Sequence, residues 1–171
     1  MKKQGIIIFG ANGSGKTTLG RELARVLGFV HMDIEDYYFE QSEIPCTVKR
    51  SREDCLNLLL SDIEKYRAFV LSAVTGDFGD VISQYYNFAV FLSAPKQLRI
   101  ERVKRRCVEK FGEMNEQSLE FVDFVSTRSL EFIEQWSDTL SCPVICVDGT
   151  IDWRANAEYI AEQYKNNRTV D

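Results

Sequence analysis

The sequence is poor in the residues that build metal centres and disulfide frameworks, with one histidine and five cysteines among its 171 residues. The cysteines are odd in number and none stands in a Cys-x-x-Cys pair, which argues against both a zinc site and a disulfide framework. We therefore expect reduced, mostly buried thiols. The single histidine, His31, falls on an expected strand without a nucleophile pattern beside it, so we expect a structural role for it.

The sequence also lacks long apolar runs and an excess of positive charge. No stretch reaches the roughly 18 consecutive apolar residues that a membrane helix needs, and the apolar run at residues 5–9 is too short for a secretory signal. Lysine and arginine number 21 against 26 aspartate and glutamate, a net charge of -5, whereas general nucleic-acid binders tend to be basic. These absences predict a cytoplasmic protein with no membrane partner and no nucleic-acid partner.

What the sequence does contain is an alternation of strand and helix patterns, which is typical of a parallel sheet with crossover helices. With 44% hydrophobic and 27% charged residues, the chain can form a single domain over residues 1–171. Because the apolar runs 6–9 and 90–92 do not alternate with polar residues, both faces of these strands should be covered. The pattern predicts a doubly wound α/β domain. Strands are expected at 5–9, 29–33, 69–72, 88–92 and 144–147, and helices at 16–27, 51–65, 96–110, 118–138 and 151–165.

The motif that points to a function lies between the first strand and the first helix. Residues 10–17 fit the Walker A pattern Gly-x-x-x-x-Gly-Lys-Ser/Thr, and the alternative is a simple glycine turn before a helix. Glycines let the chain wrap closely around phosphate with backbone N–H groups facing it, and the helix N-terminus adds a positive dipole. Lys16 is expected to reach the β and γ phosphates of ATP, and Thr17 to ligate the accompanying Mg²⁺. The expected ATP-binding residues of this segment are Gly10, Asn12, Gly13, Ser14, Gly15, Lys16, Thr17 and Thr18.

Two carboxylates follow the second expected strand, at the sheet edge where open α/β proteins bind their ligands. Asp33 and Glu35 are two residues apart, so both side chains face one crevice if the strand geometry continues through the turn. One carboxylate would then hold magnesium through a water molecule, and the other would orient an attacking hydroxyl. The alternative is an acidic turn that caps a following helix, a role that suits Asp36 best.

With these motifs the chain resembles the P-loop small-molecule and nucleoside monophosphate kinases, and most closely the shikimate kinase group, over nearly its whole length. The resemblance implies a three-layer P-loop NTPase fold with a five-stranded parallel sheet in the order 2-3-1-4-5, helices on both faces and a short lid. Asp33 and Glu35 match the group's Asp-x-Asp pair, whose first member lies near magnesium and whose second contacts the acceptor. Arg50 begins a segment similar to the group's acceptor-binding Arg-x-Arg-Glu, which lies in an acceptor segment at about 34–61.

The same resemblance assigns a lid and a base-binding turn. The lid corresponds to about residues 105–119, where Arg105 or Arg106 would close over the phosphates and stabilise the charge of the transferring group. The turn at Gly149 is similar to the turn that lies against the adenine base in related kinases, although a plain Asp-Gly turn is the alternative. The implied catalytic residues are Lys16, Asp33, Glu35 and Arg106.

Two further segments are implied to contact the acceptor. Arg128 is similar to the group's second acceptor arginine. Where the group has a triple-glycine loop after the third strand, this chain has Gly76 and Asp77, and the added acid would repel a carboxylate such as shikimate. The implied acceptor-binding residues are Asp33, Glu35, Arg50, Gly76, Asp77 and Arg128.

The sequence leaves three functions open. We favour an ATP-dependent kinase, a transferase that moves the γ-phosphoryl group of ATP-Mg to a small hydroxylated metabolite or a nucleoside, acting as a monomer or weak homodimer. A nucleoside monophosphate kinase of the adenylate or cytidylate kind is favoured by the arginines but disfavoured by the carboxylate pair, because a phosphate acceptor needs no general base. The third possibility is a regulator that binds ATP without transferring its phosphate.

Overall fold

The computed structural model describes residues 3–40 and 48–168, and within them a sheet of five parallel strands in the order β2-β3-β1-β4-β5. The expected fold class and strand order are confirmed. The strands are β1 (Gln4–Phe9), β2 (Val30–Asp33), β3 (Ala68–Ala73), β4 (Tyr86–Ser93) and β5 (Val144–Asp148). The helices are α1 (Lys16–Leu27), α2 (Ile34–Tyr38), α3 (Arg52–Lys65), α4 (Asp80–Ser83), α5 (Lys96–Phe111), α6 (Glu116–Thr127), α7 (Glu131–Ser137) and α8 (Trp153–Arg168).

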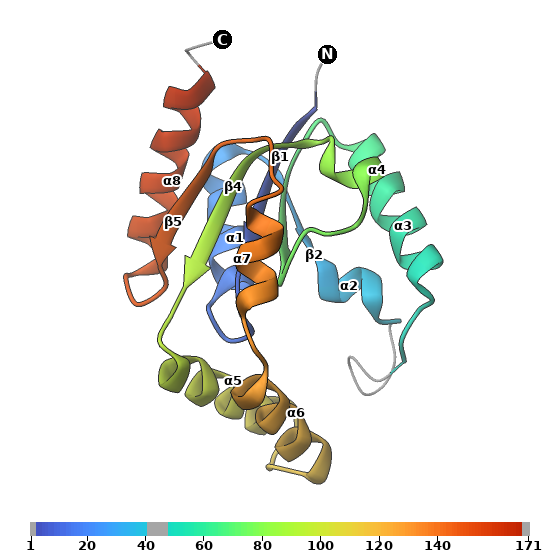
Figure 1. Ribbon diagram of the computed structural model, residues 1–171, viewed down its shortest axis with the longest axis vertical. Helices are drawn as coiled ribbons and strands as arrows, with labels where there is room; N and C mark the ends of the chain where they lie inside the picture. The colour runs from blue at the N-terminus through green and yellow to red at the C-terminus, as the bar shows by residue number, and fades with distance from the viewer. Residues whose placement is uncertain (1–2, 41–47, 169–171) are drawn as a thin grey trace.

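Helices lie on both faces of the sheet, which gives three layers (Figure 1). The central strand β1 is apolar from Ile6 to Phe9 because its successive side chains enter two separate cores. Ile6 and Ile8 pack in the core that α1 and α8 cover, whereas Ile7 and Phe9 pack in the core that α3 and α7 cover. All four side chains are completely buried. The sheet therefore holds the carboxyl end of β1, where the phosphate-binding motif begins, in a rigid position.

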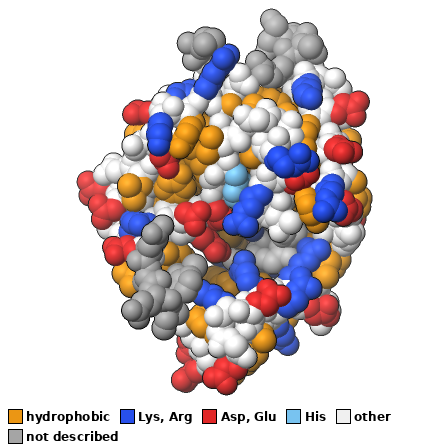
Figure 2. All heavy atoms as spheres, turned by 180° about the vertical axis from the view of Figure 1, so that it is seen from behind, with side chains coloured by type: hydrophobic (Ala, Val, Ile, Leu, Met, Phe, Trp, Pro, Cys, Tyr) orange, Lys and Arg blue, Asp and Glu red, His pale blue; other side chains and the backbone are white. Residues whose placement is uncertain are grey.

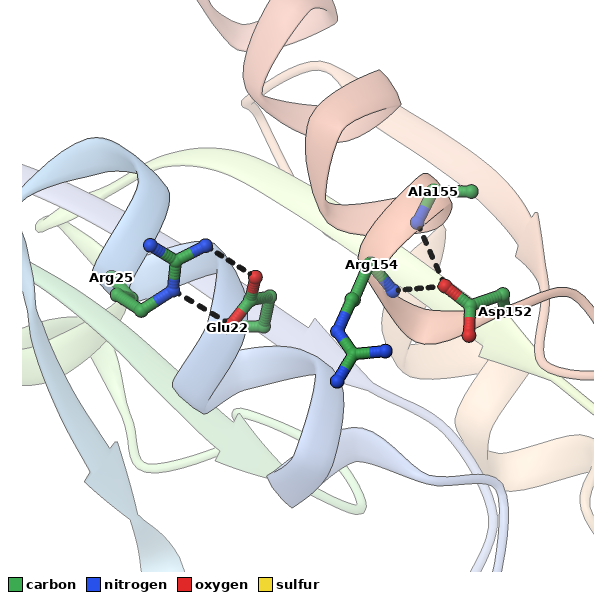
Figure 3. Close-up of polar contacts among 5 residues, drawn as sticks. All are labelled: Glu22, Arg25, Asp152, Arg154 and Ala155. Carbon is green, nitrogen blue, oxygen red and sulfur yellow. Dashed lines mark hydrogen bonds and ion pairs between the residues drawn. The ribbon is translucent and has the colours of Figure 1, made fainter.

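The helices α1 and α8 lie next to each other on one face, and polar contacts fix their ends (Figure 3). Asp152 caps α8, since its Oδ1 accepts hydrogen bonds from the backbone N–H groups of Arg154 at 3.0 Å and Ala155 at 3.3 Å. On α1, Arg25 forms an ion pair of 2.6 Å with Glu22. That hydrogen bond lowers the pKa of Glu22, and the charge of Arg154, which reaches from α8 toward α1, contributes less.

The prediction of a single helix at 118–138 is wrong, because the chain forms two helices, and the first of them ends at Thr127. Arg128 is extended, with φ -62° and ψ 127°, and its guanidinium stacks over the rings of Phe124 and Phe132. The hydroxyl of Thr127 donates to the carbonyl of Asp123 at 2.9 Å, a side-chain bond that competes with helix continuation. The short helices α2 and α4 were not among the expected elements.

The pair α5–α6 lies beyond the carboxyl ends of the strands, away from the body of the sheet (Figure 1). A small core of Val103, Cys107 and Val125 holds the two helices together. Between them Gly112 takes a left-handed conformation, with φ 77°, and Asn115 caps α6. The segment predicted as a lid thus covers the end of α5, this turn and the start of α6. No helix in the described part of the chain is both long enough and apolar enough to cross a membrane.

Candidate active site

A cavity of about 460 Å³ opens at the carboxyl ends of the strands, on the side that faces α5. Seen from behind the view of Figure 1, it is a hollow between the body of the protein and the α5–α6 pair, with lysine and arginine side chains gathered along its margin (Figure 2). It brings together four groups of residues that the sequence singled out. They are Asn12–Thr18, Asp33 with Glu35, Arg105 with Arg106, and Gly149.

The phosphate-binding motif has the backbone shape that an anion site needs. Gly13 and Gly15 have φ values of 81° and 104°, which residues with side chains rarely adopt, and a Cβ on Gly13 would collide with the carbonyl of Arg99. Lys16 and Thr17, the first residues of α1, line the cavity, so the positive end of the helix faces it, and the first turn contains no acidic residue. Within the described part of the chain, the hydroxyl of Ser14 is buried without a hydrogen-bond partner. These donors fit a bound phosphate.

Lys16 lies at the centre of this site. Its Nζ donates to the carbonyl of Ala11 at 2.9 Å, within the same loop. Burial lowers the pKa of Lys16 to about 8, although the nearby charges of Glu35 and Asp33 act to raise it. The ammonium group is therefore short of compensating negative charge, which a triphosphate would supply.

The carboxylate of Asp33 connects the phosphate-binding motif to the second strand. Its Oδ2 accepts a hydrogen bond of 2.6 Å from the hydroxyl of Thr17, and its Oδ1 accepts one of 3.1 Å from the backbone N–H of Glu35. The strand ends here and α2 begins at Ile34, so the strand geometry does not continue through Glu35, the condition under which both carboxylates were expected to face one crevice. Asp33, not Asp36, caps the following helix. The exposed Glu35 nevertheless lines the same cavity as the buried Asp33.

A magnesium ion fits the oxygen atoms that meet at this point. Thr17 offers a hydroxyl and Asp33 a carboxylate, the hard oxygen ligands that Mg²⁺ prefers. Among residues 3–40 and 48–168, no group of three or more histidine, cysteine, aspartate or glutamate side chains could hold a metal ion. A magnesium ion at Thr17 would therefore take most of its ligands from phosphate oxygens and water.

Two arginines of α5 donate hydrogen bonds to backbone carbonyls of the phosphate-binding motif. Neither was predicted to belong to the site. Arg102 donates from Nη1 to the carbonyl of Ser14 at 3.1 Å and from Nη2 to that of Gly149 at 2.9 Å. Arg99 is buried and donates to the carbonyls of Ala94 and Asn12. Their spacing of three residues places them on one face of the helix with Arg106, and that spacing was the available signal.

Comparison with known proteins identifies the family. Residues 6–120 match the family model described as AAA domain. The chain belongs to this family of P-loop NTPases. Over 180 residues it is 28% identical to the uncharacterized protein YqaC of Bacillus subtilis (strain 168), a match that covers 96% of this chain and 99% of that protein.

Solved structures show what fold this AAA-domain protein shares. Shikimate kinase from Acinetobacter baumannii, in complex with shikimate, has a TM-score of 0.58 at 19% identity, over 96% of this chain and 94% of that chain. Deoxyadenosine kinase from M. mycoides, with its products dCMP and dCDP bound, has a TM-score of 0.57 at 17% identity, over 95% of this chain and 100% of that chain. The AAA-domain protein therefore has a P-loop kinase fold.

Four residues predicted to bind the acceptor lie outside the cavity of this AAA-domain protein. Arg50 donates from Nη1 to the carbonyls of Asp36, Tyr37 and Phe39, and so holds the end of α2. Arg128 is stacked on two phenylalanine rings. Gly76 and Asp77 line a second cavity of about 360 Å³, beside Tyr86 and Trp136. Of the predicted acceptor set, the structure thus brings Asp33 and Glu35, but not Asp77, next to the phosphate-binding motif.

His31 lies behind the motif and does not line the cavity. Its Nε2 is 3.0 Å from the hydroxyl of Ser72, which in turn donates to the carbonyl of Lys16 at 3.1 Å. Burial lowers the pKa of His31. These contacts support β2, β3 and α1 against one another, in agreement with the structural role expected for this histidine.

Proposed function

We propose that this protein is an ATP-dependent kinase that transfers the γ-phosphoryl group of ATP to a hydroxyl group of a small molecule. The observation that carries the proposal is the hydrogen bond of 2.6 Å between Thr17 and Asp33. It joins a phosphate-binding motif to a carboxylate pair inside one cavity, so donor and acceptor can meet at a single point. A site that only binds ATP needs no second carboxylate beside its phosphate loop.

Each group of cavity residues would have a separate role in the transfer. The backbone N–H groups of residues 12–17 and the ammonium of Lys16 bind the triphosphate and compensate its charge. Glu35 orients the attacking hydroxyl and accepts its proton. Arg105 and Arg106, from the lid segment 105–119, neutralise the charge on the transferring group once water is excluded.

Thr17 and Asp33 would hold magnesium, Asp33 through a bound water molecule. When bound, the ion neutralises and orients the β and γ phosphates. Gly149 would lie against the base of the nucleotide. We further propose that residues 1–171 act as a single domain, cytoplasmic and monomeric or weakly dimeric.

The test is magnesium-dependent ADP release from ATP against a panel of nucleosides, nucleoside monophosphates, shikimate and small sugars. Lys16→Ala should abolish turnover because it removes the cation at the β and γ phosphates. Lys104→Ala is the matched control, since Lys104 is exposed on α5 and does not line the cavity. Full activity of the Lys16 variant, or ATP binding without any acceptor-dependent ADP release, would contradict the proposal.

A further inference from the structure

Two sets of residues of opposite charge line the cavity, and Glu109 of α5 lines it as well. The part lined by the motif and by the cationic side chains of Lys16, Arg102, Arg105 and Arg106 is called the phosphate end. We call the acceptor end the part lined by the junction of β2 with α2 and the last residues of β3. Its lining residues are Asp33, Ile34, Glu35, Ser72, Ala73 and Val74. The only ionisable side chains in this second set are two acids.

The arginines that would recognise a negatively charged acceptor are engaged elsewhere. Arg50 gives three hydrogen bonds to backbone carbonyls at the end of α2, a position in which it acts as a helix cap. Arg128 is 4.0 Å from the ring centre of Phe132 and 5.2 Å from that of Phe124. Neither side chain lines the cavity. Moving Arg50 to the acceptor end would remove its hydrogen bonds to the end of α2. Moving Arg128 there would remove its stacking on the rings of Phe124 and Phe132.

The cations of the phosphate end do not substitute for them, since the proposed function assigns Arg105 and Arg106 to the transferring phosphoryl group. Burial of Lys16 and its position in the motif commit its charge to the triphosphate. Arg102 is fixed by three backbone carbonyls around the motif. A carboxylate or phosphate on the acceptor would therefore lie beside Asp33 and Glu35, where like charges repel in a partly desolvated cavity.

We infer that the acceptor carries no anionic group: it is a neutral hydroxyl compound such as a polyol, a sugar or a nucleoside. This inference rests on the proposed kinase function and names the substrate class of the same site. Carboxylates such as shikimate, and nucleoside monophosphates, fall outside that class.

A binding experiment tests this without knowledge of the natural acceptor. The full chain, labelled with ¹⁵N and saturated with Mg²⁺ and the non-hydrolysable analogue AMP-PNP, is titrated with inorganic phosphate against a chloride control of equal ionic strength. We expect the amide signals of Ile34, Glu35 and Val74 to remain unshifted. A saturable shift of these signals by phosphate would overturn the inference.

Two variants make the readout specific. Val74→Arg places a cation at the acceptor end and should create the phosphate-induced shifts, whereas the uncharged control Val74→Gln should not. If both variants bind phosphate as weakly as the parent chain, charge does not control this end and the inference is wrong. Failure of the proposed function has a different signature, because AMP-PNP would then leave the amides of residues 13–17 unshifted, and both claims would fall.

A kinetic comparison uses matched pairs that differ only in their charge, deoxyadenosine with its 5′-monophosphate and shikimate methyl ester with shikimate. We expect the neutral member of any active pair to have a kcat/KM about 100-fold higher, because one like-charge contact at a few ångströms has this effect. A higher kcat/KM for the anionic member of a pair would contradict the inference.

Discussion

The guanidinium of Arg102 joins two loops that are far apart in the chain, because it donates to the carbonyl of Gly149 at 2.9 Å while also bonding the phosphate-binding motif. One side chain of α5 thus sets the distance between the motif and the turn after β5. Arg99 lies beside it on the same helix and donates to the carbonyl of Asn12, the neighbouring residue of the motif, and to that of Ala94. The shape of the phosphate end therefore depends on α5 as well as on the motif itself.

Arg102→Ala should lower the free energy of unfolding by about 2 kcal/mol, since three buried or half-buried carbonyls lose a charged donor. It should also raise the KM for ATP. Arg105→Ala is the matched control for stability, because Arg105 is exposed and forms an ion pair of 3.8 Å with Glu109 on the same helix. Urea unfolding of both variants checks this, and equal loss of stability would refute the role given to Arg102.

Gly149→Ala should weaken ATP binding. An added Cβ would lie 2.8 Å from the carbonyl oxygen of Ser14 and 2.9 Å from that of Ser93, so the turn or the motif must move. Gly112→Ala is the control, since Gly112 has a positive φ of 77° but nothing within 4 Å of the new methyl group. It should cost about 1 kcal/mol of stability from backbone strain alone. Calorimetric titration with ATP should show reduced affinity only for the variant at Gly149.

Asp33→Asn keeps the size of the side chain and removes its charge. The amide can still accept from the N–H of Glu35 and can donate to the hydroxyl of Thr17, but it carries no charge to attract a metal ion. We expect kcat to fall about 100-fold and the magnesium concentration for half-maximal rate to rise, with ATP binding in the absence of metal retained. Asp36→Asn, an exposed neighbour outside the cavity, should be close to the parent in both assays.

The affinity for ATP should depend on pH through Lys16. Burial lowers the pKa of this lysine to about 8 in the nucleotide-free protein, so above that pH a proton must be taken up before the ammonium can pair with phosphate. The dissociation constant for ATP should therefore rise, by at most about tenfold per pH unit, between about pH 8 and about pH 10. Below about pH 8 this dependence should be absent because Lys16 is already charged.

Calorimetric titrations across this range, with Lys16→Met as the control, separate Lys16 from other groups. The variant should bind ATP weakly and lose the pH dependence. If the parent and the variant change their affinity in parallel above pH 8, another group is responsible.

The candidate site divides sharply into what could and could not be predicted from the sequence. Residues 10–17 could be assigned because all the groups that hold phosphate there are consecutive, so the local pattern is the site. Asp33 and Glu35 could be predicted to lie at this edge of the sheet from their place at the end of a strand, although the helix that begins at Ile34 was missed. Arg50 was predicted to bind the acceptor, whereas its Nη1 bonds to backbone carbonyls. Every residue has a backbone carbonyl, so no sequence pattern identifies such a partner.

The sequence by itself determined the strands, the parallel sheet and the phosphate-binding motif, whereas the order of the strands was implied by the resemblance to P-loop kinases. Apolar strands that fill two cores, and a glycine-rich loop before an amphipathic helix, are patterns of neighbouring residues, and their physics is local. Only the tertiary structure decided which cations face the cavity and which are used to hold backbone. Seven basic side chains occur on residues 96–110, yet Arg102 is distinguished from the others only by carbonyls at residues 13, 14 and 149. Such a role depends on distances between segments that the fold brings together, and those distances arise only when the chain has folded.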